Sequence, residues 1–104
     1  MLESQAVEAA QCTESAIRLL AQQSLPHASL VLFGLRARGD PRRRSDFDLA
    51  VLPRAGFSET EILNFSESLE RSPEIIYAID LIDFRSASAE LRSKIESEGK
   101  LWKK

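Results

Sequence analysis

Two aspartates that stand two residues apart in an otherwise apolar stretch limit most strongly how this chain can fold. Asp46 and Asp48 open residues 46–52, a short apolar run that Pro53 stops, and such a run predicts a strand. Side chains two apart on a strand point to the same face, so the two carboxylates would lie close together and repel each other. Aspartate also weakens a strand. A hard divalent cation would offset both costs, because Mg²⁺ accepts one or two protein carboxylates and completes its coordination with water and phosphate oxygens.

Helix-like and strand-like segments alternate along the rest of the chain. Ser58 and Glu61 form a capping box, flanked by Phe57 and Ile62 as a hydrophobic staple, which predicts a helix that begins at Ser58 and ends before Pro73. Apolar spacing and turn residues predict the other elements, with Gly99 as the C′ residue of the last helix. These elements are helices over residues 3–23 and 87–97, and strands over residues 29–33, 75–82 and 101–102.

This order of elements predicts the fold class. Strands interleaved with helices indicate an α/β domain in which helices pack on one small sheet. The short link between the first two strands favours a mixed sheet over a purely parallel one. The length of 104 residues fits a single domain over residues 1–104.

Composition limits the kinds of binding partner and the cellular compartment that we expect for this chain. The formal net charge of −2 gives no global field toward nucleic acid or an anionic membrane. Cys12 is the sole cysteine, which excludes an internal disulfide and a cysteine-based zinc site and suits a reducing cytoplasm. The chain has neither an apolar run of the ~18–20 residues that a membrane span needs nor a signal-peptide pattern. We therefore expect a cytoplasmic chain that, being small and marginally stable alone, associates with copies of itself or with a partner protein.

A glycine-punctuated segment precedes the aspartate pair and indicates a phosphate site. Gly34 and Gly39 bracket a turn whose backbone N–H groups can approach phosphate oxygens, and a short helix after Gly34 would add its N-terminal dipole. Arg36 and Arg38 would add charge-assisted bonds to the same phosphates. Ordinary surface charge is the alternative for both arginines. The following run of Arg42, Arg43 and Arg44 reads as a solvated loop tip, or else as a contact for nucleic acid or an acidic partner.

A third carboxylate comes from the strand predicted at residues 75–82. If this strand lies beside residues 46–52, Asp80 reaches the pocket of Asp46 and Asp48; Asp83 is a rival for the same role. Three such carboxylates suit metal-assisted phosphoryl or nucleotidyl transfer. The alternatives are structural: Asp46 as the end of an Asx turn, and Asp80 as a surface residue of an edge strand.

These motifs together resemble the DNA polymerase beta-like nucleotidyltransferase superfamily, and in particular its minimal nucleotidyltransferases. The family pattern is Gly-Ser-x-Ala-x-Gly followed by Ser-Asp-x-Asp-Leu. This chain has Gly34-Leu35-Arg36-Ala37-Arg38-Gly39 and then Ser45-Asp46-Phe47-Asp48-Leu49, and Ile79-Asp80-Leu81-Ile82 resembles the strand of the third carboxylate. Leu35 departs from the pattern, because it occupies the position of the serine whose hydroxyl bonds a phosphate.

The resemblance implies a role for each matching residue. Asp46, Asp48 and Asp80 would be the catalytic and metal-binding residues, with Mg²⁺ or Mn²⁺ as the metal and Asp80 either completing the metal site or acting as a base. ATP or another nucleoside triphosphate would lie against the segment from Gly34 to Gly39, including Leu35, Arg36 and Arg38, and against Ser45.

The resemblance also implies a reaction and a partner. The expected reaction transfers a nucleoside monophosphate to an acceptor hydroxyl, with release of pyrophosphate. The expected partner is a helical protein of the HEPN (higher eukaryotes and prokaryotes nucleotide-binding) class, with this chain as the antitoxin of a toxin–antitoxin pair. Because Leu35 removes a phosphate-binding hydroxyl, the alternative is a nucleotide-binding or protein-binding module that has lost turnover.

Overall fold

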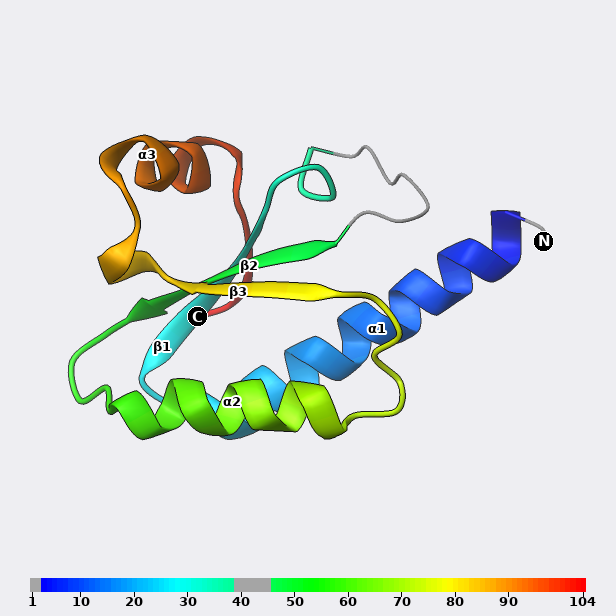
Figure 1. Ribbon diagram of the computed structural model, residues 1–104, viewed down its shortest axis with the longest axis horizontal. Helices are drawn as coiled ribbons and strands as arrows, with labels where there is room; N and C mark the ends of the chain where they lie inside the picture. The colour runs from blue at the N-terminus through cyan, green and yellow to red at the C-terminus, as the bar shows by residue number, and fades with distance from the viewer. Residues whose placement is uncertain (1–2, 39–45) are drawn as a thin grey trace.

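A computed structural model describes residues 3–38 and 46–104 and shows eight elements in the order expected from the sequence, with one added 3₁₀ turn (Figure 1). The elements are α1 (Glu3–Ser24), β1 (Ala28–Phe33), β2 (Phe47–Pro53), α2 (Glu59–Arg71), β3 (Ile79–Asp83), the 3₁₀ turn η1 (Phe84–Ser86), α3 (Ala89–Glu98) and β4 (Lys100–Lys103). Within the described residues, no helix is both long enough and apolar enough to cross a membrane.

The four strands form one mixed sheet in the order β3-β2-β1-β4. β1 runs antiparallel to both β2 and β4, whereas β2 and β3 are parallel. The parallel pair arises because α2 carries the chain back along the sheet before β3 begins, as parallel neighbours require. The predicted fold class, a small mixed sheet with helices packed on it, is therefore confirmed.

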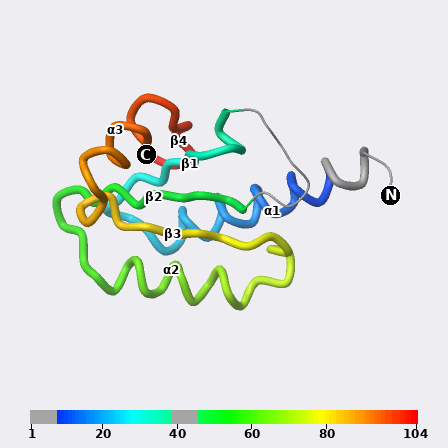
Figure 2. Tube along the Cα trace, turned by 45° about the horizontal axis from the view of Figure 1, so that its top comes forward, coloured from blue at the N-terminus to red at the C-terminus, as the bar shows by residue number. Residues whose placement is uncertain are grey.

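Helices cover both faces of the sheet (Figures 1 and 2). α1 and α2 lie together on one face, and α3 lies on the other. Alternate residues of β1 serve the two faces: Leu30 and Leu32 belong to the main core under α1 and α2, and Val31 and Phe33 belong to a small core with Ile95 of α3. β1 is buried on both faces for this reason, which explains its run of four consecutive apolar residues, Leu30 to Phe33.

The start of α2 follows the sequence prediction closely. Ser58 is the N-cap, and the reciprocal capping box with Glu61 is present. Phe57 and Ile62 are both half-buried against the main core, consistent with the predicted staple. Glu61 does more than the motif requires, because its carboxylate also accepts hydrogen bonds from the backbone N–H of His27 at 3.0 Å and from its Nδ1 at 3.0 Å. The capping box therefore also joins α2 to the start of β1.

Two of the differences from the predicted boundaries have a clear physical reason. The third strand spans Ile79–Asp83 rather than residues 75–82, because β2 begins at Phe47, which pairs with Ile79, and leaves no partner strand for the earlier residues. Ile75 and Tyr77 still pack on the main core, while Ile76 between them is 68% exposed. Gly99 is the C-cap itself, with φ −70° and ψ 151°, rather than a C′ residue, because the chain passes at once from α3 into the extended β4.

Candidate active site

Asp48 and Asp80 lie side by side on neighbouring parallel strands. They are direct partners in the register of β2 and β3, so their side chains share one face of the sheet. Ala50 and Ile82, which follow them on the same face, pack in or against the small core with α3. The two carboxylates therefore stand on the α3 face, at the end of the sheet where β2 and β3 begin.

Asp46 lies just before this pair and outside β2. Its side chain is exposed, whereas Asp48 is half-buried. Burial raises the pKa of Asp48 above its usual value, and the neighbouring carboxylates of Asp80 and Asp46 raise it further. Across residues 3–38 and 46–104, no three acidic, histidine or cysteine side chains are already gathered as a metal-binding cluster. The carboxylates thus form an open arrangement in which like charges repel each other.

The backbone at Gly34 lies directly against the Asp48 carboxylate. Phe33, the last residue of β1, pairs with Asp48, and Gly34 follows with a positive φ of 79°. A Cβ atom at Gly34 would stand 2.3 Å from Oδ2 of Asp48. Only glycine combines this left-handed backbone with so close an approach, so the sequence motif reflects contact between the turn and the carboxylate.

After Gly34 the chain makes a single helical turn. The backbone N–H of Arg38 donates to the carbonyl of Gly34 at 3.2 Å. Ala37 is buried in the main core and fastens the turn to the sheet, while Leu35 is 37% exposed. The described part of the chain thus shows one turn rather than the predicted short helix. Gly39, Ser45 and the arginine run at residues 42–44 lie outside the described residues.

The two arginines of the motif point to opposite faces of the sheet. The Arg36 guanidinium lies over the rings of Phe47 and Tyr77 on the α1–α2 side, with its central carbon 4.2 Å and 4.6 Å from their centroids. Arg38 lies on the other side, where its Nε is 3.7 Å from Oε1 of Glu98 in α3. The sequence motif gives no sign of this division, and no pattern in the sequence points to Glu98 as a neighbour of Arg38.

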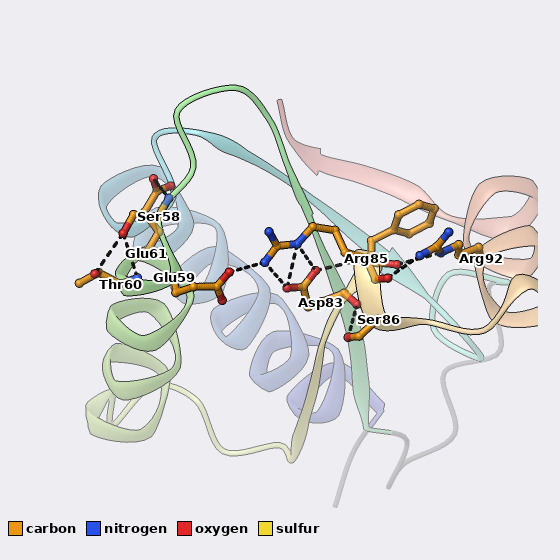
Figure 3. Close-up of polar contacts among 9 residues, drawn as sticks. Ser58, Glu59, Thr60, Glu61, Asp83, Arg85, Ser86 and Arg92 are labelled. Atoms are coloured by element: carbon orange, nitrogen blue, oxygen red, sulfur yellow. Dashed lines mark hydrogen bonds and ion pairs between the residues drawn. The ribbon is translucent and has the colours of Figure 1, made fainter.

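Asp83, the rival third carboxylate, has a structural role. It is three residues after Asp80, so it projects from the opposite face of β3. Figure 3 shows Arg85 bound to Asp83 and to Glu59 at the start of α2, with closest contacts of 2.7 Å and 2.5 Å. The hydrogen bonds from Arg85 lower the pKa of Asp83 despite partial burial. Asp83 therefore anchors the end of β3 to α2 and does not join the carboxylates on the α3 face.

Comparison with known proteins identifies a family pattern over most of the chain. The model of the family "Polymerase beta, Nucleotidyltransferase" matches residues 14–103. The protein adenylyltransferase MntA of Shewanella oneidensis is 33% identical over 94 residues, which cover 88% of this chain and 66% of that protein. This chain thus spans slightly less than two thirds of the length of that relative.

Solved structures share the fold. A chain of a toxin–antitoxin complex crystallised with AMP-PNP superposes with a TM-score of 0.67 and 29% identity, over 86% of this chain and 71% of that one. A chain from the complex of a tri-AMPylated Shewanella oneidensis HEPN toxin with its MNT antitoxin gives a TM-score of 0.61 and 26% identity, over 88% and 70% of the two chains.

Proposed function

This chain belongs to the polymerase beta nucleotidyltransferase family, and we propose that it transfers a nucleoside monophosphate from ATP, or another nucleoside triphosphate, to an acceptor hydroxyl. The acceptor oxygen forms a bond to the α-phosphorus, the bond from that phosphorus to the bridging oxygen breaks, and pyrophosphate leaves. The observation that carries this proposal is the contact of the Gly34 turn with Asp48, beside Asp80. A backbone turn suited to phosphate and a pair of carboxylates suited to a cation meet at one place.

The carboxylates fit a divalent cation. Burial raises the pKa of Asp48, and the carboxylates of Asp80 and Asp46 raise it further by repulsion, which a cation would relieve. Mg²⁺ needs only one or two protein carboxylates when substrate phosphates complete its coordination, so the open arrangement suits it. Asp46, Asp48 and Asp80 would hold Mg²⁺ or Mn²⁺, which when bound neutralises charge on the transferred phosphate and the leaving pyrophosphate. Asp80, the more exposed of the paired carboxylates, would also accept the acceptor's proton.

The triphosphate would lie along the turn after Gly34. Backbone N–H groups there and the guanidinium of Arg38, which is on the carboxylate side, would contact its oxygens, together with Gly39 and Ser45. Leu35 contributes its backbone N–H but no hydroxyl. Its half-exposed side chain would border the triphosphate, and its effect on turnover is therefore open to a direct test.

The acceptor is proposed to lie on a partner protein. Two relatives carry names that indicate this: a protein adenylyltransferase, and an MNT antitoxin bound to an AMPylated HEPN toxin. By analogy we propose ATP as the nucleotide, AMP as the transferred group and a HEPN-class protein as the acceptor, which would make this chain an antitoxin in the cytoplasm.

One experiment distinguishes the proposed transferase from the alternative suggested by Leu35, a nucleotide-binding or protein-binding module that has lost turnover. The chain is incubated with Mg²⁺, the product of the neighbouring gene, and ATP labelled at either the α- or the γ-phosphate. We expect the α-label alone to enter the acceptor, and Asp48→Asn to remove this transfer. Transfer of the γ-label would indicate a kinase, and nucleotide binding without transfer of either label would support the binding module.

A further inference from the structure

We infer that Arg36 is a positioning residue that joins the phosphate-binding turn to both carboxylate-bearing strands through Phe47 and Tyr77. This inference rests on the proposed function, because it assigns Arg36 a role in the same site. It departs from the motif interpretation, in which Arg36 would contact phosphate directly.

The contacts of Arg36 explain how it would act. Its guanidinium carbon lies 4.2 Å from the centroid of the Phe47 ring and 4.6 Å from that of the Tyr77 ring. The two rings meet edge to face, with centroids 5.5 Å apart and planes at 89°. A planar guanidinium is attracted to aromatic faces and stacks on them better than an ammonium group does, so this arrangement suits arginine in particular.

Each ring belongs to a segment that carries a proposed site carboxylate. Phe47 stands between Asp46 and Asp48, and Tyr77 precedes Asp80 by three residues on the approach to β3. A backbone hydrogen bond of 3.0 Å from the N–H of Phe47 to the carbonyl of Ala78 joins these two segments directly, without Arg36. Arg36 adds the third segment, the turn after Gly34, to the two that this bond already joins.

The same geometry disfavours direct phosphate contact. Phe47 is 3% exposed and belongs to the main core under α1 and α2, whereas its neighbour Asp48 points to the α3 face. To reach a phosphate beside Asp48, the Arg36 side chain would have to leave both rings and pass to the other side of the sheet. Arg36 therefore acts on the site through the backbone of the turn, with its side chain on the opposite face.

A double-mutant cycle tests this role. Arg36→Ala, Tyr77→Leu and the double variant are compared with wild type for kcat and for the KM of ATP at saturating Mg²⁺. Arg18→Ala is the matched control, because the Arg18 guanidinium also lies over a ring, that of Trp102 at 5.8 Å, but Arg18 belongs to α1 and not to the turn after Gly34. Circular dichroism fixes an assay temperature at which every variant is folded.

We expect Arg36→Ala to lower kcat about ten-fold or more, while the KM of ATP changes less than about three-fold, because misplaced groups cost transition-state stabilisation more than binding. The kcat of the double variant should be no lower than that of the less active single variant, since both changes break the same connection. Arg18→Ala should leave both constants unchanged.

Three results would overturn the inference. The first is a ten-fold or larger rise in the KM of ATP with unchanged kcat in Arg36→Ala, which identifies a phosphate ligand. The second is a fall in kcat of the double variant that equals the product of the falls in the two single variants, which means that the two residues act independently. The third is wild-type kcat and KM in Arg36→Ala.

If wild type binds AMP-PNP and Mn²⁺ but transfers nothing, the proposed reaction fails. The same cycle read as Mn²⁺ affinity with AMP-PNP then decides the role of Arg36: coupled losses support it, and independent losses or none refute it.

Discussion

Gly34→Ala tests most directly whether the contact between the turn and the Asp48 carboxylate makes a working site. An alanine at φ 79° adopts a left-handed backbone, which costs about 1–2 kcal/mol for a residue with a Cβ. The new Cβ would also stand 2.3 Å from Oδ2 of Asp48, so that carboxylate must leave its present rotamer. A side chain forced off its rotamer costs roughly 0.5–1.5 kcal/mol. Together these terms predict a loss of about 1.5–3.5 kcal/mol, or a fall in Tm of at least ~6 °C for a domain of this size.

Gly56→Ala provides the matched control. Gly56 also has a positive φ, 91°, and a Cβ there would come 3.0 Å from Cδ2 of His27. His27 directly precedes β1 at the end where Ala28 pairs with Pro53, whereas Phe33 pairs with Asp48 at the other end of the sheet. The control therefore carries a similar backbone penalty without touching the carboxylates. Both variants should lose stability, but only Gly34→Ala should also lose binding of Mn²⁺ with AMP-PNP.

Calorimetry with AMP-PNP and Mn²⁺, at a temperature where all three proteins are folded, measures the difference. We expect the affinity of Gly34→Ala to fall at least about ten-fold, which corresponds to 1.36 kcal/mol, and that of Gly56→Ala to stay within about three-fold of wild type. Equal affinities in all three proteins would show that the turn and Asp48 do not hold nucleotide and metal. A similar loss in both variants would assign the effect to general destabilisation instead.

Leu35, Asp48 and Glu61 each give a further test, the first two at the candidate site and the third at the start of α2. Leu35→Ser should raise single-turnover transfer about ten-fold or more, because a hydroxyl bond to a charged phosphate is worth roughly 1.5–3 kcal/mol; equal rates would show that the serine is dispensable. Asp48→Asn should keep or raise Tm at pH 7, since the raised pKa of Asp48 means that ionisation opposes folding, and this advantage should vanish as pH falls and the wild-type carboxyl is protonated. A clear drop in Tm at pH 7 would assign Asp48 a structural role. Glu61→Gln should lower Tm at pH 7: burial raises the pKa of Glu61, but hydrogen bonds from His27 and Ser58 outweigh it and lower the pKa. That loss should begin to shrink as pH falls below the usual pKa of a glutamate, about 4, and should vanish once the carboxylate is also protonated in the folded protein; a loss independent of pH would contradict it.

Local sequence signals were enough for the order of the elements. The capping box at Ser58 and Glu61 set the start of α2, because both partners lie within one helical turn. The mixed sheet was expected from the short link between the first two strands. The sequence placed Asp80 near Asp48 only if their strands were neighbours, and the structure shows the two residues as direct partners on the parallel strands β2 and β3.

Other features depend on what lies across the sheet and could be read only from the structure. Asp80 and Asp83 sit in one short run of sequence, and the pleat of β3 sends them to opposite faces, where one meets Asp48 and the other meets Arg85. The strand begins at Ile79 because Phe47 is where its neighbour begins, a fact about β2 rather than about residues 75–78.

The two arginines of the motif show most clearly the difference between what the sequence indicates and what only the structure shows. In the sequence Arg36 and Arg38 are alike, two positive charges beside a glycine turn. In the fold Ala37 is buried in the main core, and the single helical turn around it sends Arg36 to the rings of Phe47 and Tyr77 and Arg38 to Glu98 on the other face. The sequence determined which chemical groups stand near the turn. Only the packing of that turn against the sheet decided which of them face the carboxylates, because the direction of each side chain depends on contacts with residues far away in the chain.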